Sequence, residues 1–417
     1  MQLSKFGKKF CGDSATVSLM DDLGEALTNN PELLFMGGGN PARIPAAEAI
    51  FQNALHHILA DQGKTHKMLG IYQSPQGDPE FLQGIALLLS TQFGWNITAR
   101  NIAVANGSQS AFSVLFNLFA GEYQDNGFKR VQLPLVPEYV GYEDVGFADD
   151  FFRGNLPLVE YTGDNSFKYH VDFDSLTITP DTGLLCVSRP TNPTGNVLTD
   201  AEVERLASLA EQHNIPFILD GAYGTPFPNI IFTTAKPYWS PNTILVLSLS
   251  KLGLPGARTG IVVANEDVID AFVKANTILS LACGNLGPAM AKEMLRDNEL
   301  LRLCDEVVRP FYFQSAQQAI QWIHESFAGL PYRIHNAEGA IFLWLWFEGL
   351  PITSRELYQR LKKRGVLVLA GENFFVGLQE DWQHQYECIR LTYCQDPKVV
   401  RRGIEIIAEE VSAAYGK

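Results

Sequence analysis

The sequence lacks any apolar stretch long enough to cross a bilayer. Its longest uninterrupted apolar run is residues 340–347, which is eight residues long, whereas a transmembrane helix needs about 20. The lysines near the start of the chain are followed by CGDS at residues 11–14 and not by an apolar segment, so no secretory signal is expected there. We therefore expect no membrane partner.

The chain also lacks a cysteine pattern and an excess of positive charge. Its six cysteines are scattered and form no C-x-x-C motif, so we expect reduced thiols, a cytoplasmic protein and no structural metal. The 32 basic and 46 acidic residues give a net charge of −14, which repels the phosphates of nucleic acids and anionic membrane surfaces. Nucleic acid is therefore not an expected partner.

What is present is the composition of a large globular protein. The 417 residues correspond to two or three domains of about 150 residues each. Hydrophobic residues make up 46% of the chain and charged residues 19%, and we find no low-complexity tract or internal repeat. This composition excludes wholesale disorder and a fibrous protein.

The middle of the chain alternates short apolar runs with longer helical patterns. This alternation is typical of a mostly parallel sheet that is covered by helices. The expected strands are residues 101–105, 130–135, 183–188, 216–219, 243–247 and 260–264. Residues 108–120 and 200–213 are expected to form helices between them. We predict an α/β fold with a mixed, mostly parallel sheet.

A different pattern follows from about residue 290. It predicts a long helical stretch to about residue 327, then three strands and a last helix at residues 340–347, 365–369, 389–393 and 397–414. We expect this part to be a smaller α+β domain. The predicted division is a large domain of residues 46–294 and a small domain of residues 1–45 plus 295–417.

A lysine follows the predicted strand 243–247 in a setting that suits covalent chemistry. Lys251 stands among small hydroxyl residues and glycines, and Arg258 follows seven residues later. Open α/β sheets bind their ligands at the carboxyl ends of the strands, so the lysine suits a Schiff-base role beside a phosphate group that the arginine holds. Taken alone, Lys251 would more often be a solvated loop lysine.

Two further strand ends carry polar residues that suit a cofactor ring. Asp220 ends the strand 216–219, where a carboxylate can keep a pyridinium nitrogen protonated, and Tyr223 can reach a phenolic oxygen. Asn192 lies after the strand 183–188, in a loop that two prolines stiffen. Each of these could also be an ordinary turn or core residue, and only their shared place at strand ends favours a site.

An anion site is expected where the first helix of this region begins. Gly107, Ser108 and Gln109 lie between the strand 101–105 and that helix, so the free N–H groups of the first helical turn point outward. An ordinary helix cap is the alternative. Because the lysine, the aspartate, the asparagine and this helix start share one sheet edge, we favour a joint ligand site.

A glycine run at residues 37–42 matches the dinucleotide-binding pattern G-x-G-x-x-A. Pro41 and Pro45 interrupt the helix that such a site requires. We therefore reject a dinucleotide site and expect the backbone of these glycines to approach a small ligand.

Together these motifs resemble the class I aminotransferases of pyridoxal 5′-phosphate fold type I. Three segments carry the resemblance in the family's order and spacing: Asn192-Pro193-Thr194-Gly195, Asp220-Gly221-Ala222-Tyr223, and Ser248-Leu249-Ser250-Lys251 followed by Arg258. The resemblance covers essentially the whole chain. It implies that family's fold, with a mostly parallel large domain and a smaller α+β domain, the cofactor pyridoxal 5′-phosphate, and a homodimer.

The resemblance implies a role for each residue near the cofactor ring. Lys251 would carry the cofactor and then act as general base and acid, and Asp220 would pair with the ring nitrogen. Tyr223 and Asn192 would donate hydrogen bonds to the 3-oxygen of the ring. Tyr139 matches the aromatic residue that stacks on the ring. Lys251, Asp220 and Tyr223 are thus the expected catalytic residues.

The resemblance also implies the partners of the phosphate and of the substrate. The phosphate would be bound by Gly107, Ser108, Gln109, Ser248 and Arg258, and by Tyr72 from the partner subunit of the homodimer. Arg390 would bind the α-carboxylate of the substrate with both arms of its planar guanidinium. Asn192 and a backbone N–H near Gly39 would complete that substrate site.

Longer stretches resemble one branch of the family, which exchanges the amino group between L-valine and pyruvate and forms 3-methyl-2-oxobutanoate and L-alanine. They are MGGGNPARIP, NGSQSAFSVLFNLFAG, SRPTNPTGNVLTD, SLSKLGLPGARTG and EGAIFLWLWF. The expected mechanism is ping-pong. Transamination of other aliphatic amino acids and a C–S lyase reaction remain alternatives. A noncatalytic ligand-sensing module is disfavoured, because every catalytic position is retained and no helix-turn-helix extension is seen.

Overall fold

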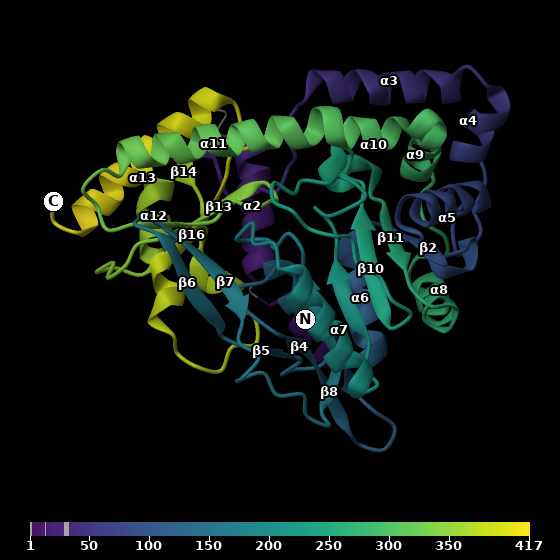
Figure 1. The fold of residues 1–417 in the computed structure, drawn as a ribbon, viewed down its shortest axis with the longest axis horizontal. Coiled ribbons are helices and arrows are strands. Elements are labelled where there is room, and N and C mark those ends of the chain that lie inside the picture. Colours follow the sequence, from purple (N-terminus) through teal and green to yellow (C-terminus); the bar gives the residue numbers. More distant parts are fainter. Residues whose placement is uncertain (1, 13, 29–32) are drawn as a thin grey trace.

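Two large sheets organise the chain in the computed structural model (Figure 1). The structure describes residues 2–12, 14–28 and 33–417. Among these residues the first sheet has eight strands and the second has six, and a two-stranded ribbon pairs β1 (Leu34–Phe35) with β14 (Val366–Leu367) in parallel. β10 and β11 of the first sheet lie to the right in Figure 1, and the second sheet lies to the left beside α12 and α13.

The first sheet is the mixed, mostly parallel sheet that the sequence predicts. Its order is β2 (Ile102–Ala105), β11 (Gly260–Val263), β10 (Thr243–Ser248), β9 (Phe217–Asp220), β8 (Thr182–Ser188), β4 (Phe128–Leu133) and β3 (Gly121–Glu122), with β5 (Phe152–Gly154) beside β4. β10, β9, β8 and β4 run parallel to one another. β11 is antiparallel to both of its neighbours, β10 and β2, and β3 is antiparallel to β4. Every residue of β8, β9 and β10 is buried, which explains why these strands appear as continuous apolar runs in the sequence.

Helices pack on this sheet or on one another. They are α3 (Pro45–Leu59), α4 (Gln62–Leu69), α5 (Pro79–Phe93), α6 (Ser108–Phe119), α7 (Asp200–Gln212), α8 (Glu266–Ser280) and α9 (Leu286–Leu295). Four of them, α4, α5, α7 and α8, begin at a side-chain cap. At the start of α7, Thr199 accepts a hydrogen bond from the backbone of Glu202 while the Glu202 carboxylate accepts one from the backbone of Thr199. This reciprocal cap satisfies two backbone donors and places the start of α7.

The second sheet joins parts of the chain that are far apart in sequence. Its order is β15 (Leu369–Ala370), β16 (Cys388–Thr392), β13 (Phe342–Trp346), β12 (Arg333–His335), β7 (Ser166–Val171) and β6 (Pro157–Gly163). The helices of this part are α11 (Arg309–Ser326), α12 (Ser354–Lys363) and α13 (Pro397–Ala414). β6 and β7 come from inside the range 46–294, but β7 pairs with β12 and β6 pairs with β7. The predicted domain division stays a prediction, and residues 1, 13 and 29–32 of it lie outside the described residues.

The long helical stretch that the sequence predicts after residue 290 is interrupted. After α9, Asp297 and Asn298 have φ values of 52° and 57°, a left-handed conformation that Asp and Asn tolerate better than most residues. The chain continues through α10 (Glu299–Arg302) and a π-helical segment, Leu303–Val308, into α11. Apolar periodicity carries no sign of such a break, because the residues on both sides remain helical.

Two helices near the start of the chain complete the fold. They are α1 (Lys5–Phe10) and α2 (Ala15–Thr28). α2 packs against the 3-10 turn Val140–Val145, which follows β4. Among the described residues, no helix combines the length and the apolar character that a membrane crossing requires.

Candidate active site

The carboxyl ends of β8, β9 and β10 open into a cavity of about 620 Å³. It is lined by most of the residues that the sequence singles out: Gly39, Ser108, Gln109, Tyr139, Asn192, Asp220, Tyr223, Ser248, Lys251, Arg258 and Arg390. Two predicted residues, Gly107 and Tyr72, are absent from this lining within the described chain. The fold therefore brings the predicted residues together, while the role of each one remains a prediction.

Lys251 follows β10 directly, on the single 3-10 turn Ser250–Leu252. Its Nζ donates a hydrogen bond to the carbonyl oxygen of Gly39 at 2.5 Å and lies 5.5 Å from the centre of the Tyr223 ring. Burial, and next the charge of Arg390, lower the pKa of Lys251 to about 8. At pH 7 about a tenth of this lysine is therefore the neutral, nucleophilic amine, far more than of an ordinary lysine with a pKa of about 10.4.

Asp220 is the last residue of β9, and its buried carboxylate has two fixed donors. Oδ2 accepts a hydrogen bond from the hydroxyl of Tyr142 at 2.7 Å, and Oδ1 accepts one from the backbone N–H of Ala222 at 2.9 Å. Burial raises the pKa of Asp220 to about 6. The carboxylate is still mostly ionised at neutral pH and can hold a proton on a neighbouring ring nitrogen.

Tyr142 and Glu138 belong to this site, and sequence reasoning missed both of them. Glu138 is fully buried, and its carboxylate accepts hydrogen bonds from the backbone N–H and the hydroxyl of Ser188, at 2.8 and 2.5 Å, and from the backbone N–H of Tyr139. Ser188 is the register partner of Asp220. Burial raises the pKa of Glu138 to about 8. Both residues flank Tyr139, but no spacing rule connects them with Asp220 some 80 positions later.

Arg390 lies in β16 of the second sheet and reaches the cavity from the opposite side. One arm donates to Asn192 Oδ1 at 2.6 Å and the other donates to the carbonyl oxygen of Gly37. The guanidinium lies 3.9 Å from the centre of the Phe342 ring. Only 2% of Arg390 is exposed, and within the described chain its Nε has no hydrogen-bond partner. A buried cation with an unused donor is suited to a carboxylate that comes from outside.

The glycine run at residues 37–39 contacts two of the three basic side chains that line the cavity. Gly37 and Gly39 offer their carbonyl oxygens to Arg390 and Lys251, respectively. This arrangement agrees with a backbone that approaches a small ligand, as the sequence analysis expects. The predicted use of an N–H near Gly39 stays a prediction.

The start of α6 and Arg258 lie against each other at the cavity, where the sequence predicts an anion site. Gly107 has a φ of 93°, and a Cβ atom there would lie 2.3 Å from a guanidinium nitrogen of Arg258. Ser108, Gln109 and Ser248 line the cavity beside this contact. Backbone N–H groups of a helix start, two serine hydroxyls and a guanidinium are a donor set that suits a phosphate.

This donor set as a whole fits pyridoxal 5′-phosphate. The cofactor requires an acid at its ring nitrogen, donors at its ring oxygen, an anion site and an amine, and the cavity offers Asp220, Tyr223, Asn192, the start of α6 and Lys251.

A third group of lining residues comes from the N-terminal part of the chain. Thr16, Leu19 and Met20 of α2 and Phe35 of β1 line the same cavity. Their apolar character favours an aliphatic ligand group over a charged one. Sequence reasoning missed them, because an amphipathic helix does not reveal which surface it covers.

Tyr72 lies on the outside of this chain. It is 84% exposed, and Leu69, Ile71 and Ile278 are also exposed, at 70, 52 and 87%. An exposed apolar group of this kind is typical of a surface that another protein covers. A role for Tyr72 in its own cavity has no support in the structure, whereas a role in a partner's cavity stays a prediction.

Comparison with known proteins identifies the relatives of the chain. Residues 43–407 match the family model described as aminotransferase class I and II. The chain is 50% identical to the valine–pyruvate aminotransferase of Escherichia coli (strain K12), with complete coverage of both chains. It is 26% identical to the aspartate/prephenate aminotransferase of Thermus thermophilus, over 96% of this chain and 97% of that protein.

Two solved structures are similar over almost their full length. The valine-pyruvate aminotransferase from Salmonella typhimurium LT2 is 49% identical with a TM-score of 0.89, and the match covers 97% of this chain and 100% of that one. A putative amino-acid aminotransferase from Psychrobacter arcticum 273-4 is 42% identical with a TM-score of 0.97, and the match covers both chains completely.

Proposed function

Since the chain belongs to the class I and II aminotransferase family, we propose that it transfers the amino group between L-valine and pyruvate, forming 3-methyl-2-oxobutanoate and L-alanine. Its cofactor is pyridoxal 5′-phosphate, and the reaction is a ping-pong transamination. The full-length identity of 50% with the valine–pyruvate aminotransferase of E. coli supports this substrate pair.

One observation carries the proposal. The buried Arg390, whose Nε has no hydrogen-bond partner among the described residues, lines the same cavity as Lys251 and Asp220. A carboxylate bound at Arg390 thus enters a cavity that already contains a nucleophilic amine and a buried acid. This combination suits an amino acid that reacts at its Cα atom.

When bound, pyridoxal 5′-phosphate supplies an electron sink that stabilises negative charge at the Cα atom of the substrate. Asp220 would hold the proton on the ring nitrogen, and Tyr142 keeps the Asp220 carboxylate in place. Tyr223 and Asn192 would donate hydrogen bonds to the ring oxygen. Lys251 Nζ would act first as the base that takes the proton from the substrate Cα and then as the acid that returns it, a double role that its lowered pKa of about 8 permits.

The substrate is oriented by its carboxylate and selected by its side chain. Arg390 binds the carboxylate, and Asn192, which accepts from Arg390, lies beside it. Leu19, Met20 and Phe35 offer an apolar wall, so a charged side chain would lose its hydration without gaining a partner. Because an apolar pocket separates side chains that differ by one methylene only about 10 to 200-fold, other aliphatic amino acids are expected to be poorer substrates and not excluded ones.

We also propose a homodimer in which Tyr72 reaches the phosphate site of the partner subunit. Exposed apolar side chains support this arrangement: Leu69 and Ile71, which precede Tyr72 in the chain, and Ile278, Leu279 and Leu281. In a twofold dimer the same surface of each subunit would cover the other. A cytoplasmic location and the assigned roles of Gly107, Ser108, Gln109, Tyr139, Ser248 and Arg258 belong to the same proposal.

Product analysis tests this function. The purified protein, loaded with pyridoxal 5′-phosphate, is incubated with L-valine and pyruvate, and all products are quantified. We expect equal amounts of 3-methyl-2-oxobutanoate and L-alanine, and little reaction when L-glutamate or L-aspartate replaces L-valine. Release of ammonia and pyruvate from L-cysteine without alanine formation from L-valine would establish the C–S lyase alternative instead.

A further inference from the structure

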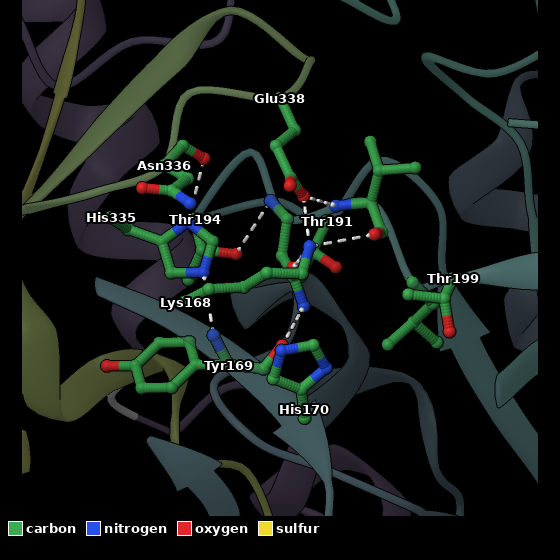
Figure 2. A network of polar contacts seen from close by, with 12 residues as sticks. Lys168, Tyr169, His170, Thr191, Thr194, Thr199, His335, Asn336 and Glu338 are labelled. Carbon is green, nitrogen blue, oxygen red and sulfur yellow. Dashed lines mark hydrogen bonds and ion pairs between the residues drawn. The ribbon is translucent and has the colours of Figure 1, made fainter. Parts of the chain in front are cut away.

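A buried ion pair lies behind the loop that carries Asn192. Lys168 of β7 pairs with Glu338, which precedes β13. Lys168 is only 7% exposed, and 18% of the Glu338 side chain is exposed. Figure 2 shows the two side chains pointing toward each other across the loop that follows β8.

The pair closes a ring of hydrogen bonds with this loop. Lys168 Nζ donates to Asn196 Oδ1 and to the carbonyl oxygen of Val197, both at 3.0 Å, in addition to Glu338. Glu338 Oε2 also accepts from the backbone N–H of Val197 at 2.9 Å. The three N–H groups of the ammonium therefore have three acceptors, two of them on the loop.

The loop is stiff enough to carry this constraint to Asn192. The backbone N–H of Thr191 donates to the carbonyl of Asn196, and the N–H of Gly195 donates to the carbonyl of Thr191, both at 2.8 Å. Gly195 has a φ of 72°, and a Cβ atom there would lie 2.7 Å from the carbonyl oxygen of Gly339. Asn192 thus lies inside a short turn whose end is held by Lys168 and Glu338.

The other end of the ion pair leads to Arg390. The chain continues from Glu338 into β13, whose first residue, Phe342, lies under the Arg390 guanidinium. β13 also pairs with β16, and Trp344 is the register partner of Arg390. The ion pair thus connects the turn that carries Asn192 with the strand that supports Arg390.

A buried ion pair is weak support for stability as such, because apolar residues of similar size often stabilise a protein as well or better. An ammonium group can, however, fix the relative position of two segments, because its N–H groups donate to acceptors on both of them. This directional hold coincides with the two residues whose relative position matters for the substrate, Asn192 and Arg390, which are 2.6 Å apart at their contacting atoms.

We propose that Lys168 and Glu338 are positioning residues that hold the Asn192 turn against the strand supporting Arg390, so that the cofactor's ring oxygen and the substrate carboxylate are bound at one fixed spacing. This inference rests on the proposed function, because it uses the roles assigned there to Asn192 and Arg390. Neither Lys168 nor Glu338 lines the cavity among the described residues, so both act through the loop.

The test uses the cofactor-loaded enzyme and four variants. Lys168→Met and Glu338→Gln each break the pair, and Lys168→Met with Glu338→Leu replaces both partners without leaving a buried charge. Arg153→Met is the matched control, because it removes an ion pair with Asp181 at 2.7 Å in the first sheet. Three quantities are measured below each variant's melting temperature: the Kd of 3-methylbutanoate, the Kd of the cofactor, and the pH midpoint of the visible absorption band. 3-Methylbutanoate has the carboxylate and side chain of valine without its amine.

We expect the three variants of the pair to bind 3-methylbutanoate about tenfold more weakly, as one misplaced hydrogen bond to a charged group would cause. The pH midpoint of the visible band should move up by about one unit. In the wild type, the hydrogen bond from Asn192 stabilises the negative ring oxygen and so favours loss of the proton from the nitrogen that joins Lys251 to the cofactor. In the variants this hydrogen bond is misplaced, so the proton is lost at a higher pH. Cofactor binding should weaken as well. Arg153→Met should lower the melting temperature and leave all three quantities unchanged.

The positioning role would be overturned if all three variants had the two Kd values and the pH midpoint of the wild type, and only the single variants had a lower melting temperature. The ion pair would then serve only the stability of the fold. A double variant that regains the melting temperature but still binds 3-methylbutanoate weakly supports the positioning role. If the wild type shows no visible band after loading, the proposed function itself fails, and this outcome is distinct from a failure of the ion-pair inference.

Discussion

The hydroxyl of Tyr142 lies 2.7 Å from Oδ2 of Asp220, inside the core behind the candidate active site. Tyr142 is fully buried and contacts the rings of Phe112, Phe116 and Tyr139 edge-on. Aromatic packing therefore fixes the hydroxyl, and the hydroxyl fixes the carboxylate. The acid that is assigned to the cofactor's ring nitrogen is preorganised by a residue that does not itself line the cavity in the described chain.

Replacing Tyr142 with Phe should impair catalysis while the fold persists. The change removes the hydrogen bond to the ionised Asp220, which is worth about 1.5 to 3 kcal/mol for a charged acceptor, so kcat should fall roughly 10 to 100-fold. The pKa of Asp220 should rise further, because the hydrogen bond favours its charged form. Steady-state kinetics measured from pH 5 to 9 check both effects, and an unchanged kcat with an unchanged pH profile would remove Tyr142 from the site.

Glu138 should make the cofactor-free protein less stable at high pH. Burial raises the pKa of Glu138 to about 8 in the folded protein, far above the value of about 4.3 in an unfolded chain. Between these two values the folded state binds the extra proton, so stability falls as pH rises, by up to about 1.4 kcal/mol per pH unit for a fully bound proton. Asp220, with its pKa raised to about 6, contributes in the same direction over a narrower range.

The variant Glu138→Gln tests this pH dependence, because glutamine keeps the size of the side chain and cannot ionise. Urea unfolding of the cofactor-free protein at pH 5.5 and pH 8 should show a smaller loss of stability in the variant than in the wild type. Equal losses in both proteins would show that Glu138 is ionised in the folded state throughout this range.

Arg390→Lys should separate substrate binding from the other functions of the site. Lysine keeps the positive charge but loses the planar pair of donors, so we expect the KM for L-valine to rise about 10 to 100-fold, corresponding to the loss of one charge-assisted hydrogen bond. Cofactor affinity and the visible spectrum should change little. A KM equal to that of the wild type would assign Arg390 to the structure of the second sheet instead of to the substrate.

Tyr72→Phe tests the proposed dimer. If the hydroxyl of Tyr72 binds the phosphate in the partner subunit, the variant should remain a dimer and bind pyridoxal 5′-phosphate about 10-fold more weakly. Analytical ultracentrifugation and cofactor titration measure the two properties separately. A monomeric wild-type protein with full cofactor affinity would contradict both the dimer and the role of Tyr72.

Much of the first sheet could be predicted, because its strands are short, buried runs that turn residues separate. Because Lys251, Asp220 and Asn192 follow the ends of these strands, the sequence predicted that they lie close together. Arg390 was predicted only from the resemblance to a known family, since it lies in β16 of the other sheet. Parallel strands with both faces covered leave a simple mark in a sequence.

The remaining features depend on contacts between distant segments. The hairpin of β6 and β7 pairs with β12, more than 150 residues further along the chain, and its alternating pattern would suit either sheet. Glu138 and Lys168 look like ordinary charged residues in the sequence. Their importance comes from burial and from partners such as Ser188 and Glu338, which local patterns do not encode.

We propose that both half-reactions of a transamination take place in the same cavity. The most direct measurement is the visible absorption spectrum of the cofactor-loaded protein, recorded before and after addition of L-valine, and again after the valine is removed and pyruvate is added. We expect the visible band to disappear with L-valine and to return with pyruvate, and we expect Lys251→Ala to show no such band. A wild-type band that ignores L-valine would contradict the substrate, and the absence of any band would contradict the site.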